Sequence, residues 1–139
     1  MKADPEQRVR QLCLALPETS EKISHGRPSF RVGERMFAMF MDDHHGDGRV
    51  AVWLKAAPGV QEILVGSDPR RFFVPPYVGP SGWIGVRVDL DPDWEEVAVH
   101  VREAHREAAD AASARRRRSP SRAPRREGPP RRRSQQPRR

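Results

Sequence analysis

Two apolar segments of the sequence place a tryptophan close to a cation. Trp53 precedes Lys55 by two residues, and Trp83 precedes Arg87 by four. Side chains at even spacing share one face of a strand, so we expect each pair to lie on one side of a sheet. Aromatic rings stack on bases and cations bind phosphates, which makes these residues candidate nucleic-acid contacts. In the alternative interpretation, the two tryptophans cover the sheet beneath a loop or in a dimer.

A second group of residues indicates a site for a small molecule. His25 lies in an expected bend, and Tyr77 follows two prolines in the aromatic stretch from Phe72 to Val88. His25 is a candidate general base or ligand-binding group; alternatively, it hydrogen-bonds to the backbone and shapes the bend. The sequence therefore leaves open a ligand site near His25, Tyr77 and Trp83.

No motif for catalysis or for a cofactor stands out. The chain lacks a glycine-rich phosphate loop, a catalytic-triad pattern and paired cysteines, and we therefore expect a non-enzymatic protein without a cofactor. One charged turn contains the residue types that bind metals, but their spacing fits neither the calcium loop nor a usual zinc site. We expect a solvated turn without a metal in this segment, which contains Asp42, Asp43, His44, His45 and Asp47.

Charge is distributed unevenly along the 139 residues. Residues 1–112 contain 14 Lys and Arg against 18 Asp and Glu, a net charge of −4, whereas residues 113–139 contain 12 Arg and one Glu, a net charge of +11. The acidic balance of the first part weakens the case for a nucleic-acid surface there, because nonspecific affinity for DNA is mostly electrostatic. The second part has the opposite character, and we expect it to attract DNA or RNA.

Segment 113–139 is rich in Arg, Pro and Ser and has no large apolar residue, so we expect a disordered basic tail. Alternative interpretations are a solubilising extension or a stretch without a selected role. A chain that ends near Ala112 is expected to lose most of its affinity for DNA. The candidate phosphate contacts in the tail are Arg115, Arg116, Arg117, Arg118, Arg131, Arg132 and Arg133.

Cys13 is the single cysteine, which excludes an intramolecular disulfide and suits a reducing compartment. It lies on the apolar stripe of the first expected helix, and this position favours a structural role. The sequence has neither a long apolar run nor a signal-peptide pattern. We therefore expect a soluble, cytoplasmic protein with no membrane partner.

Helices are expected at both ends of the folded part. Asp4 and Pro5 suit the N-cap and the first helical position, and Pro17 ends the helix that they start. Asp91-Pro92 is expected to start the last helix in the same way, and that helix should run to about Ala112. A short helix is predicted from Pro58 to Val65.

Short strands fill the middle of the chain. The clearest are Ser29 to Val32 and Arg35 to Met41, joined by a type II′ turn that would set Phe30 opposite Phe37. Met39 and Met41 would then share the side of Phe37. Further strands are expected at Lys22–Ser24, Val50–Lys55, Phe72–Val74 and Trp83–Asp89. The elements predict an α+β two-layer sandwich, with an antiparallel sheet of five or six strands and the terminal helices on one face.

Several segments, in this order, resemble the MmcQ/YjbR family. They are LALPETSE at Leu14–Glu21, HGRPSFRV at His25–Val32, MFAMF at Met36–Phe40, VWLKAAP at Val52–Pro58, VPPYVGPSGWIGVRVD at Val74–Asp89 and PDWEEV at Pro92–Val97. The resemblance implies a YjbR-like α/β domain at residues 1–112, with a fold similar to that of frataxin and related in shape to double-wing DNA-binding modules. The family pattern implies no catalytic residues and does not include the basic tail. Its recurring positions correspond to His25, Gly26, Pro28, Phe30, Lys55, Tyr77, Gly82 and Trp83.

Two hypotheses follow. In the first, the chain is a small non-enzymatic protein that associates with nucleic acid, and the basic tail supplies much of the affinity. In the second, it is a module for a small molecule or another protein, with the ligand near His25, Tyr77 and Trp83. Under the first hypothesis, the contacts of the folded domain are Trp53, Lys55, Tyr77, Trp83 and Arg87.

Overall fold

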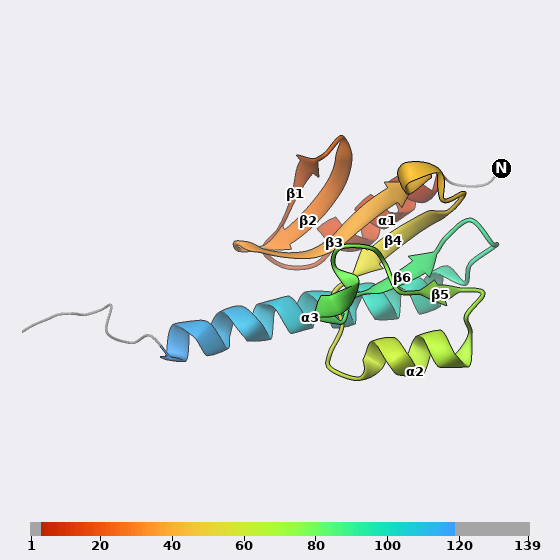
Figure 1. Cartoon of the computed structure of the whole chain (residues 1–139). Helices are drawn as coiled ribbons and strands as arrows, with labels where there is room; N and C mark the ends of the chain where they lie inside the picture. Colours follow the sequence, from red (N-terminus) through yellow and green to blue (C-terminus); the bar gives the residue numbers. More distant parts are fainter. Residues whose placement is uncertain (1–3, 119–139) are drawn as a thin grey trace, which may run out of the picture. The chain divides into compact units, whose positions relative to one another are not determined.

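The computed structural model describes residues 4–118, so the predicted contacts at Arg131, Arg132 and Arg133 lie outside the described residues. Contacts divide the chain into two units, Met1–Ala109 and Asp110–Arg139, and the fold below is that of the first. The elements (Figure 1) are α1 (Pro5–Leu14), β1 (Thr19–Ser24), β2 (Arg27–Val32), β3 (Arg35–Asp42), η1 (His44–Gly46), β4 (Val50–Leu54), α2 (Val60–Ser67), β5 (Phe72–Phe73), η2 (Gly79–Ser81), β6 (Ile84–Arg87) and α3 (Trp94–Arg118).

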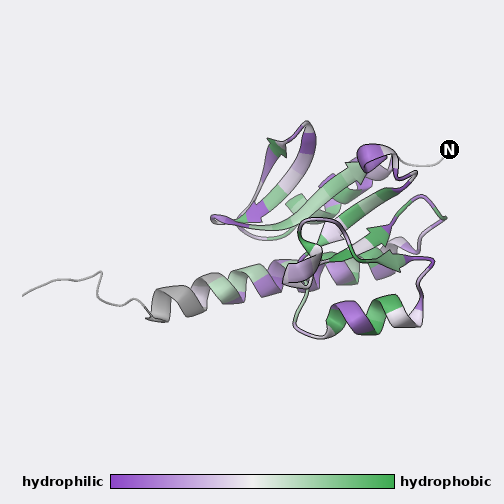
Figure 2. Ribbon diagram, viewed as in Figure 1, coloured by the Kyte–Doolittle hydropathy of each residue, from purple (hydrophilic) through white to green (hydrophobic). Residues whose placement is uncertain are grey.

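The strands form one six-stranded sheet in the order β1-β2-β3-β4-β6-β5, and all neighbours are antiparallel. β6 lies between β4 and β5, so the chain reaches the edge with β5 before it returns towards the middle. The central strands β3, β4 and β6 are largely green in Figure 2, which marks them as apolar. Such composition suits strands that are covered on both faces.

One face of the sheet carries the helices and the main core. Val9 of α1 and Val101 of α3 pack there with Val52 of β4, and α2 adds Leu64. The opposite face carries a smaller cluster, to which no residue of the described helices belongs. The predicted α+β arrangement with helices on one face is therefore confirmed. The buried members of the smaller cluster are Met39, Met41, Ala51, Trp53, Phe73 and Trp83.

The two terminal helices start and end partly as predicted. Asp4 caps α1, since its carboxylate accepts a hydrogen bond from the backbone N of Glu6 at 3.2 Å. The start predicted for α3 is too early, because Asp91, the predicted N-cap, has a φ of 54°, whereas an N-cap residue is normally extended. Asp93 precedes α3 instead, and its carboxylate accepts from the backbone N of Glu95 at 3.0 Å.

α3 also extends six residues beyond its predicted end, to Arg118. Residues 113–118, which were expected to be disordered, are therefore helical. Their sequence explains the difference, because Ala and Arg are among the residues with the highest helix propensity. Among residues 4–118, no helix has both the length and the apolar character that crossing a bilayer requires.

The pairing of β2 with β3 differs from the predicted one. Gly33 has a φ of 60°, as the first central position of a type II′ turn requires, and the strands pair as expected next to the turn. Beyond it, Arg31 pairs with Met36 but Phe30 pairs with Ala38. Phe37 is thus an extra residue on β3, and the strand contains a β-bulge at this point.

The bulge reverses the alternation of side chains along β3. Phe37 enters the main core together with Phe30, while Met36 packs on the opposite face with Met39 and Met41. The predictions that Phe30 opposes Phe37 and that Phe37 shares a side with the methionines are therefore wrong. Phe37 is also fixed from outside its strand, because its carbonyl accepts a hydrogen bond from the backbone N of Lys55 at 3.0 Å.

Candidate functional site

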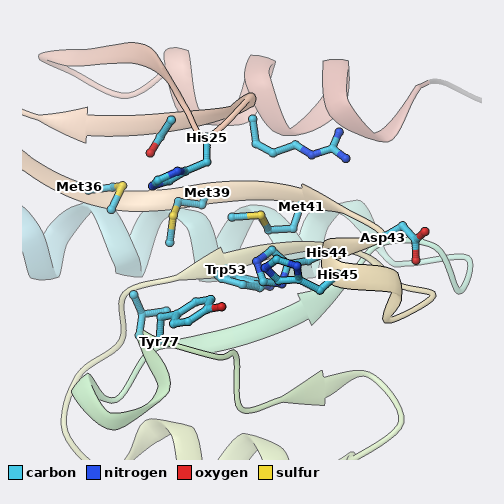
Figure 3. Close-up of a pocket in the computed structure, with 12 residues that line it drawn as sticks. His25, Met36, Met39, Met41, Asp43, His44, His45, Trp53 and Tyr77 are labelled. Atoms are coloured by element: carbon cyan, nitrogen blue, oxygen red, sulfur yellow. The ribbon is translucent and has the colours of Figure 1, made fainter.

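A pocket of about 650 Å³ lies on the sheet face that the helices leave uncovered. β3 and β4 form its floor (Figure 3), and its walls come from the β1–β2 turn, the β3–β4 connection with η1, and the loop between β5 and β6. A volume of this size suits a small organic molecule. The residues that line the pocket are Ser24, His25, Arg27, Met36, Met39, Met41, Asp43, His44, His45, Trp53, Tyr77 and Val78.

Three methionines of β3 make up much of the floor and lie side by side in Figure 3. Met39 and Met41 are each 8 % exposed, and Met36 is half-buried. The bulge at Phe37 brings Met39 and Met41 to the same face as Met36. Methionine side chains are unbranched and polarizable, so they adapt to the shape of a ligand and make favourable contacts with aromatic rings.

The walls contain an unusual concentration of left-handed backbone. Of six non-glycine residues with positive φ among the described residues, four line the pocket: His25 (54°), Asp43 (55°), His45 (51°) and Tyr77 (67°). This conformation costs roughly 1 kcal/mol or more for a residue with a Cβ atom. Asp and His tolerate it better than other side chains, which makes Tyr77 the most strained of the four. Strain of this kind concentrates at functional sites.

The turn between β1 and β2 contains His25, although its backbone geometry does not require a histidine. Ser24 pairs with Arg27, so His25 and Gly26 are the central residues of a two-residue hairpin loop, with φ values of 54° and 79°. These values fit a type I′ turn, for which Asn-Gly is the preferred sequence. Within residues 4–118 the His25 side chain forms no hydrogen bond, so the interpretation that it braces the bend finds no support.

His44 is the centre of an aromatic group in the pocket. Its ring centroid lies 4.9 Å from that of Trp53, 5.9 Å from that of Tyr77 and 4.2 Å from that of His45, each in an edge-on arrangement. Burial is the main cause that lowers the pKa of His44, and the nearby His45 is the second. Asp47 raises this pKa, and Arg27 lowers it further. The His44 ring is therefore neutral near pH 7 and offers one donor and one acceptor.

The prediction of a merely solvated turn is wrong for His44, which is half-buried against Trp53. Sequence alone did not place Trp53 beside the turn, since that contact depends on the path of the β3–β4 connection. Within the described part of the chain, no three His, Cys, Asp or Glu side chains are grouped so as to hold a metal ion.

Hydrogen bonds hold two of the walls in place. In the β3–β4 connection, the Asp43 carboxylate accepts a bond from the backbone N of Gly48 at 2.8 Å. In the β5–β6 loop, Nε2 of Gln61 donates to the backbone carbonyls of Gly79 and Trp83, at 2.9 and 2.6 Å. Gln61 belongs to α2, so this loop is attached to a helix. The walls are therefore formed before any ligand binds, which lowers the entropic cost of binding.

Trp53, in the floor of the pocket, carries a polar group without a partner. The residue is 2 % exposed, and its indole N–H has no hydrogen-bond acceptor among residues 4–118. Leaving a buried donor unpaired costs roughly 1–3 kcal/mol, and few groups in folded proteins are left so. The N–H is enclosed by the protein, so it is not open to a ligand in the pocket.

The residues predicted to contact nucleic acid do not form one surface. Trp53 and Trp83 are only 2 % and 6 % exposed, which fits the interpretation in which they cover the sheet. Arg87 is paired with Asp89 at 2.9 Å, and the hydrogen bonds to that carboxylate raise the pKa of Arg87. Lys55 lines a different, smaller cavity of about 260 Å³, beside α2 and α3.

The residues predicted for a ligand site are brought together in part. His25 and Tyr77 lie on opposite sides of the pocket in Figure 3, but Trp83 does not line it, and Trp53 does. Tyr77 is 75 % exposed and is the accessible ring among the predicted contacts. Sequence reasoning missed Arg27, His44 and the methionine floor. A signal for the floor was available, since three of the four methionines of the chain fall within MFAMFM.

Comparisons with known proteins agree with this fold. A model of the YjbR family matches residues 14–107. The crystal structure of the Deinococcus radiodurans protein DR2400, described as a DUF419 domain, is similar with a TM-score of 0.65 and 20 % sequence identity, over 79 % of this chain and 83 % of that one. A comparison with curated proteins gives no match. Because the family model covers more than half of the chain, the protein belongs to the YjbR family.

Proposed function

We propose that the domain is a binding module for a small organic molecule and that the ligand occupies the pocket over β3 and β4. The observation that carries the proposal is the set of left-handed residues in the pocket walls, His25, Asp43, His45 and Tyr77. Asn or Gly would adopt the same backbone at lower cost. Asp43 holds its connection through the hydrogen bond from Gly48, but the larger side chains of His25, His45 and Tyr77 are explained if they serve a ligand rather than the fold.

The pocket favours binding over catalysis. Nucleophilic catalysis uses a hydroxyl or thiol that is hydrogen-bonded to a base. Ser24 is next to His25 in the sequence, yet among the lining residues no hydroxyl is hydrogen-bonded to an imidazole. The floor is apolar and adaptable, and the polar groups lie at the rim, which is the usual distribution in a ligand pocket.

Substitutions that keep the backbone conformation test this proposal. Small molecules that bind the full-length protein are first found by saturation-transfer NMR with a mixed set of aromatic, aliphatic and polar compounds. Tyr77→Asn and His25→Asn are expected to weaken binding of these compounds at least tenfold, because both remove lining side chains from turns that accept Asn. Glu18→Asn is the matched control, since Glu18 has a φ of 58° but does not line the pocket. Equal affinities for all three variants and the wild type would contradict the proposal.

A second proposal concerns the C-terminal segment. Residues 113–139 carry a net charge of +11, and we propose that they bind nucleic acid without sequence preference. The buried rings of Trp53 and Trp83 offer little surface for stacking on bases, so most of the affinity is assigned to this segment. A chain that ends at Ala112 is expected to lose most DNA affinity, and the full chain should bind less tightly as salt is raised. Equal affinity of the two chains at one salt concentration would contradict it.

A further inference from the structure

We propose that the ligand of the pocket is a planar aromatic molecule with an acidic group, a carboxylate or a phosphate, and that Arg27 binds the acid. This inference rests on the proposed function and gives it a ligand class. The ring would lie over the methionines of β3, beside Tyr77 and His44, and the acid would face the end of the pocket where Arg27 begins β2.

Arg27 has the free donors that the acid requires. Within residues 4–118 its side chain forms no ion pair and one hydrogen bond, from Nη2 to the backbone carbonyl of Asp42 at 2.8 Å. A guanidinium has five N–H donors, so most of them remain for a ligand. The flat fork of an arginine matches two oxygens of a carboxylate or phosphate.

The other charges around the pocket agree with an anionic ligand. Asp43 is the one carboxylate among the lining residues, and its Oδ1 is engaged by the backbone N of Gly48 at 2.8 Å. The imidazoles of His25, His44 and His45 add N–H donors at the rim. Arg27 is the one Lys or Arg side chain among the lining residues, and no ion pair neutralises its charge within residues 4–118. A neutral ligand would leave the guanidinium without a counter-charge.

The shape and chemistry of the floor favour a ring. Met36, Met39 and Met41 present thioethers in a row, and sulfur makes favourable contacts with aromatic rings. His44 already meets Trp53 edge-on at 4.9 Å, the geometry that aromatic pairs prefer. Tyr77 is 75 % exposed on the opposite side, where its ring gains cover from a bound planar molecule.

Matched acids and neutral analogues test the inference in the full-length protein. The probes are indole-3-carboxylate against indole-3-carboxamide, and adenosine 5′-monophosphate against adenosine. Because the arginines of residues 113–139 also attract anions, binding is followed through the ε-methyl resonances of Met36, Met39 and Met41, which report on the pocket alone. At least one acid is expected to bind about tenfold more tightly than its neutral analogue. The pair with the larger ratio of acid to neutral affinity shows which of the two anions contributes more to binding.

Arg27→Gln is expected to remove the preference, so that acid and neutral analogue bind equally. Arg70→Gln is the control, since Arg70 is an exposed arginine that does not line the pocket, and it should keep the preference. Unchanged methyl resonances in the free Arg27→Gln variant establish that the pocket is intact, and Arg27→Lys provides a second variant if they change. Equal binding of acids and neutral analogues to the wild type would overturn the inference but leave the proposed function standing. If no probe and no screened compound shifts the methionine methyls, both fail.

Discussion

Replacing Tyr77 by glycine and by alanine tests whether the pocket wall is strained. In an ordinary loop, the alanine variant is more stable than the glycine variant by about 0.4–1 kcal/mol, because glycine has more freedom in the unfolded chain. Tyr77 has a φ of 67°, and there the Cβ atom of alanine costs about 1–2 kcal/mol that glycine avoids. The order of the two variants should therefore be reversed, with glycine more stable by about 0.5–1 kcal/mol.

The exposure of the ring sets the comparison with the wild type. Tyr77 is 75 % exposed, so only about a quarter of its side chain is covered. A fully buried tyrosine covers about 200 Å², which gives about 50 Å² here and about 1 kcal/mol of lost burial in either variant. Tyr77→Ala is thus expected to be about 1 kcal/mol less stable than the wild type, and Tyr77→Gly to lie within about 0.5 kcal/mol of it.

Urea denaturation followed by circular dichroism measures these differences in the free energy of unfolding. Ser81 provides the control, because it is exposed in the same loop and has no positive φ. At Ser81 the usual order should hold, with alanine more stable than glycine. If the alanine variant at position 77 is as stable as the glycine variant, or more stable, the wall is not strained, and the main support for the proposed function is lost.

Three further predictions concern stability and reactivity. Gly85→Ala is expected to lower the free energy of unfolding by about 1–3 kcal/mol, because a Cβ there would lie 2.6 Å from Cε1 of Phe73. Urea denaturation should show that a Phe73→Ala background removes most of this loss, and an equal loss in both backgrounds would show that the Phe73 ring is not its cause. The pKa of His44 is lowered mainly by burial, so the unfolded state binds more protons, and the free energy of unfolding should be highest above about pH 6.5 and decrease below it. Denaturation at several pH values should show a smaller decrease for His44→Asn, and an unchanged decrease would count against this cause. Burial raises the pKa of Cys13 to about 12, so iodoacetamide should alkylate this thiol only after unfolding. Mass spectrometry measures the alkylation, and rapid labelling of the native protein would argue against that burial.

Patterns that depend on local sequence were predicted well. Asp4 and Pro5 start α1 because capping is decided within one turn of helix. The alternation in β4 placed Val52 and Trp53 on opposite faces of the sheet, and the two cores contain them accordingly. The helices on one face followed from strands with one strongly apolar side.

The predictions failed where the backbone leaves its regular course. The bulge at Phe37 adds one residue to β3 and exchanges the faces of every side chain beyond it, and nothing in the alternating apolar residues marks that position. Tyr77 adopts its left-handed conformation in a loop whose path depends on a residue distant in sequence, because Gln61 of α2 donates hydrogen bonds to the carbonyls of Gly79 and Trp83. The pocket depends on both features. Its position was therefore only partly predictable, through His25 and Tyr77.

The central claim is that a planar molecule occupies the pocket on the uncovered face, and intermolecular NOEs test it most directly. Protein with ¹³C-labelled methionine methyls is mixed with the tighter-binding of the indole and adenosine acids. The ring protons of the ligand should show NOEs to the methyls of Met36, Met39 and Met41 and none to Met1, the remaining methionine of the chain. A bound ligand that shows no NOE to any of the three pocket methyls would contradict the account.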